Sequence, residues 1–298
     1  MKKLLFIFIM SVLISNQINF DSNKAYNFVL EQCSFGPRYP GSEGHSKCKN
    51  YLVEKVNSYC KETIIDEHTI IDPLTSDSVK IYNIFGRIKP ELKKRVLFMA
   101  HWDTRQFADK DPDPLNHKKP VLGANDGASG IAVLLTLMDY FNKNSPTNFG
   151  IDFLLTDAED MGRYGEPDTW ALGAKLFSES YKGDLPQFGI CVDMVGDKNL
   201  EIKIEQYSYK MAPYLINHIW SLASSLGYSS FSWEMGNHII DDHVAFSKAT
   251  QVPSIDIIDL DYIHWHTIKD TPDNVSQHSL EIVGNVLTHF INNLDKSE

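Results

Sequence analysis

Short apolar runs rich in β-branched residues alternate along the chain with longer stretches whose apolar positions recur every three or four residues. The short runs are typical of buried strands, and the longer stretches are typical of amphipathic helices. The predicted strands are Ile81–Arg87, Arg95–Ala100, Gly150–Thr156, Phe188–Val195, Leu200–Gln206 and Ser254–Ile258. The predicted helices are Ala128–Asn142, Thr169–Ser178, Met211–Leu226 and Leu280–Leu294. Because strands alternate with helices, the pattern predicts an α/β fold, a three-layer sandwich whose central mixed, mostly parallel β-sheet is flanked by helices.

The first residues have a different pattern from the rest. Lys2 and Lys3 precede an apolar run from Leu4 to Ile14, which is too short to cross a bilayer comfortably. We therefore predict that residues 1–20 are a secretory signal peptide and that the mature chain is exported, to the periplasm or beyond the cell. A membrane anchor retained by the mature protein is the alternative. No repeat or linker divides the remainder, so residues 21–298 are predicted to be a single domain.

Composition and charge narrow the function classes. The 298 residues are 43% apolar, which is enough to bury a sizeable core and excludes a disordered tail or a coiled coil. The formal charge of −11 argues against binding to nucleic acid or to an anionic membrane surface. The four cysteines form no CxxC pair, so neither a thiolate zinc knuckle nor a redox pair is indicated. After export some of them could form disulfides, with the pairing left open among Cys33, Cys48, Cys60 and Cys191.

Five polar clusters lie where a predicted strand gives way to a loop or where a helix begins. They are His101–Asp103, Gly123–Gly130, Asp157–Asp160, Asp193 and Trp265–Thr267. Each places a carboxylate or an imidazole beside apolar strand residues. An isolated buried charge costs several kcal/mol, roughly, so these groups must pair with one another or bind a cation. In open α/β sheets, ligands bind where strands end, so the clusters predict a functional site at one edge of the sheet.

The residue types suit a catalytic zinc site. Such sites take three protein ligands from His, Asp and Glu and leave a position open for water or substrate. Asp126 in its glycine-rich turn, Asp160 after a strand, and the late His266 would supply these ligands. Glu159 directly precedes Asp160, and because adjacent side chains diverge it can face the substrate while Asp160 binds the ion.

The ordered set of motifs resembles the zinc-dependent aminopeptidase superfamily that includes the glutaminyl-peptide cyclotransferases, or glutaminyl cyclases. The resemblance extends from Phe35–His45 to the last predicted helix, and it is greatest to the bacterial glutaminyl cyclases. Three features support the resemblance to the bacterial enzymes: the stretch HWDTRQFADKDPDP before GANDGASG, the segment Ile240–Phe246, and Trp265 immediately before a metal-type histidine. It implies an enzyme that converts the N-terminal glutamine of peptides or proteins to pyroglutamate with release of ammonia.

The resemblance also implies roles for individual residues. Asp126, Asp160 and His266 would bind one catalytic zinc ion per chain, and Glu159 would act as the general acid/base. Asp160 is one methylene shorter than the glutamate of the animal enzymes, so the backbone must restore the distance to the metal.

Two further carboxylates, Asp241 and Asp193, match members of a hydrogen-bonded network in the catalytic site of the family. Asp256 stands where the animal enzymes have a histidine. Ala100 stands where they have a disulfide-bonded cysteine, so that bridge is absent here.

One aromatic wall of the substrate pocket is implied to be Trp265. The second wall has no direct match, because Gly165 occupies the aligned position. Trp170 is our choice for a substrate-binding residue there, with Tyr164 as the alternative.

Two other functions remain open. His101 and Asp193 could complete a second metal site bridged by Asp126, which would make the protein a two-zinc aminopeptidase that hydrolyses N-terminal residues. The chain could also be a non-catalytic binding module on the same fold, although such modules typically lose the ligands that are present here.

Overall fold

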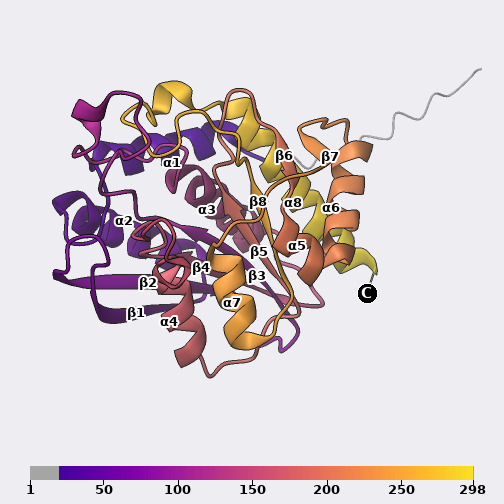
Figure 1. The fold of residues 1–298 in the computed structure, drawn as a ribbon. Helices are drawn as coiled ribbons and strands as arrows, with labels where there is room; N and C mark the ends of the chain where they lie inside the picture. Colours follow the sequence, from indigo (N-terminus) through magenta and orange to yellow (C-terminus); the bar gives the residue numbers. More distant parts are fainter. Residues whose placement is uncertain (1–19, 298) are drawn as a thin grey trace, which may run out of the picture.

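A computed structural model describes residues 20–297, and its centre is a mixed six-stranded β-sheet (Figure 1). In spatial order the strands are β1 (Glu62–Ile71), β2 (Ser78–Ile88), β4 (Gly150–Thr156), β3 (Arg95–His101), β5 (Gly189–Asp193) and β8 (Ser254–Ile258). The pairs β1/β2 and β2/β4 are antiparallel, whereas β4/β3, β3/β5 and β5/β8 are parallel. The predicted mixed, mostly parallel sheet is therefore confirmed. Strands β3, β4, β5 and β8 are buried along their whole length, which explains their continuous apolar runs.

Helices cover both faces of the sheet. One face carries α1 (Ser22–Ser34), α2 (Glu43–Tyr59), α3 (Ala128–Lys143) and α8 (Gln277–Ser297), which enclose the largest apolar cluster of the core. The other face carries α4 (Leu172–Ser180) and α7 (Asp242–Thr250), which pack against each other (Figure 1). A smaller apolar cluster lies under these two helices and includes Phe85, Leu154 and Phe246.

The structure differs from the prediction at residues 200–206, where one strand of the main sheet was expected. Only β6 (Ile202–Ile204) is extended, and it pairs with β7 (Phe231–Met235) in a separate two-stranded sheet. The predicted helix Met211–Leu226 is divided into α5 (Gln206–Met211) and α6 (Pro213–Ser225), because Pro213 has no N–H to continue the first helix. Three short 3-10 turns, η1 (Pro114–Asn116), η2 (Pro167–Thr169) and η3 (Pro272–Asn274), complete the described elements.

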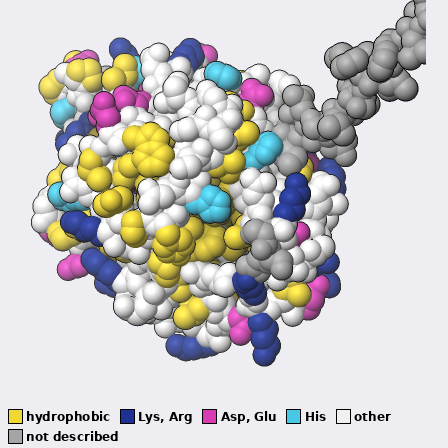
Figure 2. Space-filling view, turned by 90° about the vertical axis from the view of Figure 1, so that its right-hand side faces the viewer, with side chains coloured by type: hydrophobic (Ala, Val, Ile, Leu, Met, Phe, Trp, Pro, Cys, Tyr) yellow, Lys and Arg dark blue, Asp and Glu magenta, His cyan; other side chains and the backbone are white. Residues whose placement is uncertain are grey.

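Exposed apolar side chains gather on the face formed by the small sheet and α6. Figure 2 shows this face, which lies to the right in Figure 1. Tyr214, Trp233 and Met235 are each about half exposed there (54%, 51% and 51%). This exposed apolar surface is formed by α6 and β7 and not by the central six-stranded sheet.

The N-terminal region and the cysteines bear on two further predictions. The predicted signal peptide lies outside the described residues except for Phe20, whose ring packs against Gly284 of α8. Within residues 20–297 no helix has the length and apolar character needed to cross a membrane.

All four cysteines carry free thiols, and Cys33, Cys48 and Cys191 are buried.

Candidate active site

The ends of the parallel strands bring the five polar clusters together. Strand β3 ends at His101 and β5 at Asp193, while Asp160 follows β4 and His266 follows β8. Asp126 joins them from the turn that precedes α3. The sequence-based prediction of convergence at one edge of the sheet is therefore confirmed by the positions of these side chains.

The backbone turns sharply at three positions in the loops that follow these strands. Ala158, Met194 and His266 follow β4, β5 and β8 and have positive φ angles of 57°, 47° and 53°. Non-glycine residues rarely adopt this conformation, and it is found mainly where a surrounding structure enforces it at functional sites. The chain therefore accepts local strain in order to aim side chains into the site.

Asp126, Asp160 and His266 meet in an arrangement that fits a divalent cation. The Nε2 atom of His266 lies 2.8 Å from Oδ1 of Asp160 and 3.4 Å from Oδ2 of Asp126. All three side chains are buried, and Oδ2 of Asp126 and Oδ2 of Asp160 have no hydrogen-bond partner among the described residues. Buried polar atoms without partners are uncommon, and one imidazole with two carboxylates is a zinc ligand set. These three residues therefore fit a bound zinc ion.

A buried carboxylate that the sequence analysis missed holds the Asp126 turn. Asp270 accepts hydrogen bonds from the backbone N–H groups of Asn125 (2.8 Å) and Asp126 (3.1 Å) and from the hydroxyl of Tyr262 (2.9 Å). Burial, with the nearby charge of Asp126, raises the pKa of Asp270 to about 7. No local pattern around Asp270 marks this role, because the turn that it holds, at Asn125 and Asp126, lies far away in sequence.

Asp103 holds the opposite side of the site in the same way. It accepts hydrogen bonds from the backbone N–H groups of Glu159 (3.1 Å) and Asp160 (3.2 Å). Its backbone oxygen would lie 2.6 Å from a Cβ atom at Gly127, where φ is 95°. The NDG turn therefore needs glycine at this position both for its conformation and for the close approach.

The second ring nitrogen of His266 is also engaged. Its Nδ1 atom lies 2.6 Å from the hydroxyl of Tyr164 and 3.5 Å from a carboxylate oxygen of Asp109. Burial alone would raise the pKa of Asp109, but His266 and Arg105 hold it at about 2. Arg105 also donates to the backbone oxygen of Asp160 at 2.8 Å. Partners of this kind fix the orientation of a metal-binding imidazole.

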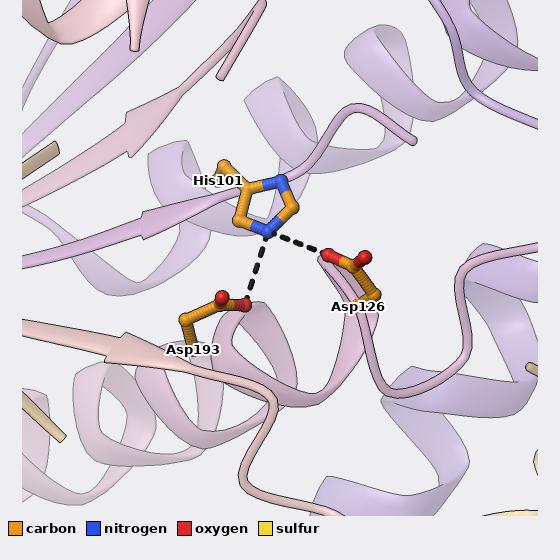
Figure 3. Close-up of side chains that lie close together, drawn as sticks. All are labelled: His101, Asp126 and Asp193. Atoms are coloured by element: carbon orange, nitrogen blue, oxygen red, sulfur yellow. Dashed lines mark hydrogen bonds and ion pairs between the residues drawn. The ribbon is translucent and has the colours of Figure 1, made fainter. Parts of the chain in front are cut away.

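A second group of possible ligands shares Asp126. The Nε2 atom of His101 lies 3.0 Å from Oδ1 of Asp193 and 3.2 Å from Oδ1 of Asp126 (Figure 3). Because Oδ2 of Asp126 faces His266, the two oxygens of this carboxylate point to different imidazoles. Burial opposes a proton on His101, but the charge of Asp193 and hydrogen bonds to Asp103 and Asp126 raise its pKa well above the usual value. Burial raises the pKa of Asp193 to about 7.

Glu159 and Asp241 line the cavity beside the ligand trio. Burial and the neighbouring charge of Asp241 raise the pKa of Glu159 well above its usual value, against the effect of His101. Asp241 caps the N-terminus of α7, and the thiol of Cys191 lies 3.9 Å from both of its carboxylate oxygens. A carboxyl group with such a raised pKa is typical of a catalytic acid or base.

Behind Asp241 a chain of buried polar groups continues away from the cavity. Burial and the charge of Asp241 raise the pKa of Asp256 well above its usual value. Asp256 lies 3.5 Å from Nδ1 of His243, whose Nε2 lies 3.2 Å from Glu205. His243 and Glu205, to which the sequence analysis gave no role, are therefore part of this buried polar chain.

Aromatic side chains form one side of a cavity of about 310 Å³ above the trio. The ring of Trp265 lies 4.1 Å from the imidazole of His266, measured between centroids. Trp170 is stacked parallel to the same imidazole at 6.3 Å, and Tyr164 lies 5.5 Å from Trp170 and 6.2 Å from Trp265. Both predicted pocket residues, Trp265 and Trp170, are thus at the cavity, and Tyr164 joins them.

Comparisons with known proteins agree with this fold and site. A model of peptidase family M28 matches residues 83–291. The glutaminyl cyclase of Bacteroides thetaiotaomicron, solved with bound N-acetylhistamine, is 37% identical, with a TM-score of 0.89 over 92% of this chain and 98% of that one. A leucine aminopeptidase precursor from the same species matches with the same identity, coverage and TM-score.

A curated relative matches over a shorter stretch. The alkaline phosphatase isozyme conversion protein of Escherichia coli K12 is 36% identical over 106 residues, which are 35% of this chain and 30% of that protein. The resemblance to bacterial glutaminyl cyclases is thus confirmed in sequence and fold, and the chain belongs to peptidase family M28.

Proposed function

We propose that this protein is a glutaminyl-peptide cyclotransferase that uses one zinc ion per chain to convert N-terminal glutamine of peptides or proteins to pyroglutamate, releasing ammonia. The observation that carries the proposal is the aromatic cavity at the ligand trio. Trp265 lies against His266, and Trp170 is stacked on the same imidazole, so an uncharged amide side chain would be enclosed beside the metal. The likeness to a named glutaminyl cyclase over 92% of the chain supports the same reaction.

The ligand trio and the aromatic walls bind and orient the substrate. A zinc ion held by Asp126, Asp160 and His266 would polarise the γ-carbonyl of the glutamine as a Lewis acid. Trp265 and Trp170 would hold the methylene groups of the side chain and exclude water. The α-amine and the γ-carbon belong to one residue, so this enclosure supplies the proximity that ring closure needs.

Glu159 moves the proton in this scheme. The α-amine nitrogen forms a bond to the γ-carbon, and the bond from that carbon to the amide nitrogen breaks. Glu159 accepts a proton from the substrate α-ammonium, which frees the amine to attack. It delivers this proton to the departing nitrogen, which leaves as ammonia, and then accepts the second proton from the new ring nitrogen, so that the lactam keeps a single N–H. A raised pKa suits a carboxyl group that must both accept and donate a proton, and the neighbouring Asp241 contributes to that rise.

The test compares two substrates with the zinc-loaded enzyme. Ammonia release and fluorogenic cleavage are measured with Gln-initiated and Leu-initiated peptides, with a chelator control and the Glu159→Gln variant. We expect ammonia from the Gln substrate only, and loss of that activity on chelation and in the variant. Preferential cleavage of the Leu substrate would refute the cyclase assignment.

A two-zinc aminopeptidase is the second candidate function. The position of Asp126 between His101 and His266 favours it, because one carboxylate oxygen faces each imidazole. The similar protein described as a leucine aminopeptidase precursor supports it as well. Zinc analysis of the active enzyme separates the two functions, with one ion expected for the cyclase and two for the aminopeptidase.

The remaining predictions from the sequence follow from the same proposal. The substrates would be exported peptides or proteins with an N-terminal glutamine, met in the periplasm or outside the cell after removal of residues 1–20. The net charge of −11 supports a protein that binds neither nucleic acid nor, after signal removal, membrane.

A further inference from the structure

A second cavity of about 430 Å³ lies beside the catalytic pocket and is lined by residues of helices α4 and α7. The two cavities share Pro167, Trp170 and Ile240, so they meet at these residues. Trp170 is fixed there by a hydrogen bond of 3.1 Å from its indole N–H to the backbone oxygen of Arg163. The second cavity, which we call the α4–α7 groove, is therefore adjacent to the pocket at the zinc ligands, with Trp170 and Ile240 at the boundary.

One face of each helix lines the α4–α7 groove. On α7 the lining residues are Val244, Ala245, Lys248 and Ala249, whose spacing places them on one side of the helix. On α4 they are Lys175 and Glu179, one turn apart. The small alanine side chains leave room for a ligand, and the charged side chains give the groove a polar rim.

The two lysines of the groove lack ionic partners. Within residues 20–297 no carboxylate lies within ion-pair distance of the ammonium group of Lys175 or Lys248, whereas other lysines, such as Lys24 and Lys203, form ion pairs. Both lysines are exposed. Their ammonium groups are therefore available as hydrogen-bond donors to carbonyl or carboxylate oxygens of a bound ligand.

We propose that the α4–α7 groove binds the polypeptide chain that follows the N-terminal glutamine of the substrate, an inference that rests on the proposed cyclase function. Only the first residue of the substrate folds back on itself, so the rest of the chain must leave the pocket. The groove adjoins the pocket at Trp170 and Ile240, and it offers both apolar contacts and lysine donors for that chain.

The length of the helices sets how much of the substrate the groove accommodates. Helices α4 and α7 have nine residues each, which corresponds to about 13 Å at about 1.5 Å per residue. An extended peptide covers about 3.3 Å per residue, so about four residues after the glutamine lie along the groove. The binding contribution of the substrate chain therefore stops increasing after about the fifth residue.

The first test measures kcat/KM for ammonia release with a minimal substrate, a glutamine aryl amide, and with Gln-initiated alanine peptides of two to eight residues. We expect kcat/KM to rise severalfold up to about five residues and then to level off. The Ala249→Trp variant fills the groove and should abolish that rise while it retains activity on the minimal substrate. The matched control is Asn217→Trp at an exposed position of α6, which should leave the rise intact.

The outcomes separate the two proposals. If the minimal substrate releases no ammonia, the proposed function is refuted and the groove assignment with it. If the minimal substrate reacts but peptide length has no effect, or if Ala249→Trp retains the full rise, only the groove assignment is refuted.

A second variant tests the groove by charge and does not depend on filling it. In Lys248→Glu we expect the ratio of kcat/KM for Gln-peptides with lysine against glutamate at the following positions to increase about twofold to fivefold, the range of exposed ion pairs. The control Lys198→Glu, in an exposed turn outside the groove, should leave the ratio unchanged. An unchanged ratio in Lys248→Glu would contradict the inference.

Discussion

Replacement of Asp270 is the sharpest test of how the fold holds the proposed metal site. Its carboxylate is fully buried and accepts three hydrogen bonds, from the N–H groups of Asn125 and Asp126 and from the hydroxyl of Tyr262. Asp270→Ala would leave three buried donors without an acceptor, at a cost of about 1–2 kcal/mol each. We therefore expect the free energy of unfolding to fall by about 3–6 kcal/mol, a large part of the stability of an ordinary domain.

Asp270→Asn separates stability from metal binding. The amide retains one oxygen acceptor but turns an NH2 group toward a backbone donor, so we expect a loss of about 1–3 kcal/mol. The Asp126 turn would loosen, and zinc affinity should fall about 10-fold to 100-fold, as for other residues that orient metal ligands.

The assays are urea unfolding of the metal-free protein and competition for zinc with a chelator of known affinity. The matched control is Asp273→Ala, which removes an exposed carboxylate three residues away in η3 and should change neither quantity. An unfolding free energy of Asp270→Ala within about 1 kcal/mol of the unchanged protein would refute the reasoning, because exposed substitutions typically have effects of that size.

Three further predictions concern the imidazole and the aromatic walls. Without metal, burial lowers the pKa of His266, but Asp160 and other carboxylates raise it to about 9, so zinc must displace a proton from the imidazole. Calorimetry in buffers of different ionisation enthalpy should therefore show proton release on zinc binding. The zinc affinity should also rise by up to about tenfold per pH unit from pH 7 to 9. Tyr164→Phe removes the hydroxyl at Nδ1 of His266 and leaves Asp109 at 3.5 Å, so zinc affinity should fall about tenfold. The measurement is the competition for zinc with a chelator, and an unchanged affinity would exclude Tyr164 as a positioning residue. Trp265→Ala should lower kcat/KM for Gln-initiated substrates by about 10-fold to 100-fold, because the substrate loses a large aromatic contact, and the zinc content should not change. Loss of zinc in this variant would contradict the role of Trp265 as a wall of the pocket.

The sequence predicts those parts of the fold whose burial is complete. Strands β3, β4, β5 and β8 were found because apolar residues occupy both of their faces. Strand β1 was missed because it lies at the sheet edge with mostly exposed or half-exposed residues. The predicted strand at residues 200–206 shows the opposite limit, because an apolar alternation indicates an extended segment but not the sheet that it joins.

The same distinction applies to the site. Asp126, Asp160 and His266 are conspicuous in sequence because each is a polar residue next to an apolar strand or a glycine-rich turn. Asp270 and Asp109 escape notice because they lie in polar loops, where carboxylates are common. Their importance arises from the hydrogen bonds of Asp270 to Asn125 and Asp126 and from the contact of Asp109 with His266. These partners lie more than 100 positions away, and no local pattern encodes such contacts.

A proton on His101 and a second zinc ion are alternatives at the same place. Oδ1 of Asp126 and Oδ1 of Asp193 both face Nε2 of His101, and this negative surrounding raises the pKa of the imidazole well above its usual value. A protonated His101 balances part of the negative charge of Asp126 and Asp193, which a second cation could balance instead. A metal ion that binds to His101 must first displace this proton. The proton on His266 must be displaced in the same way, so a raised imidazole pKa is common to both metal positions. The number of zinc ions in the active enzyme, and not the protonation of His101, therefore distinguishes the cyclase from the two-zinc aminopeptidase.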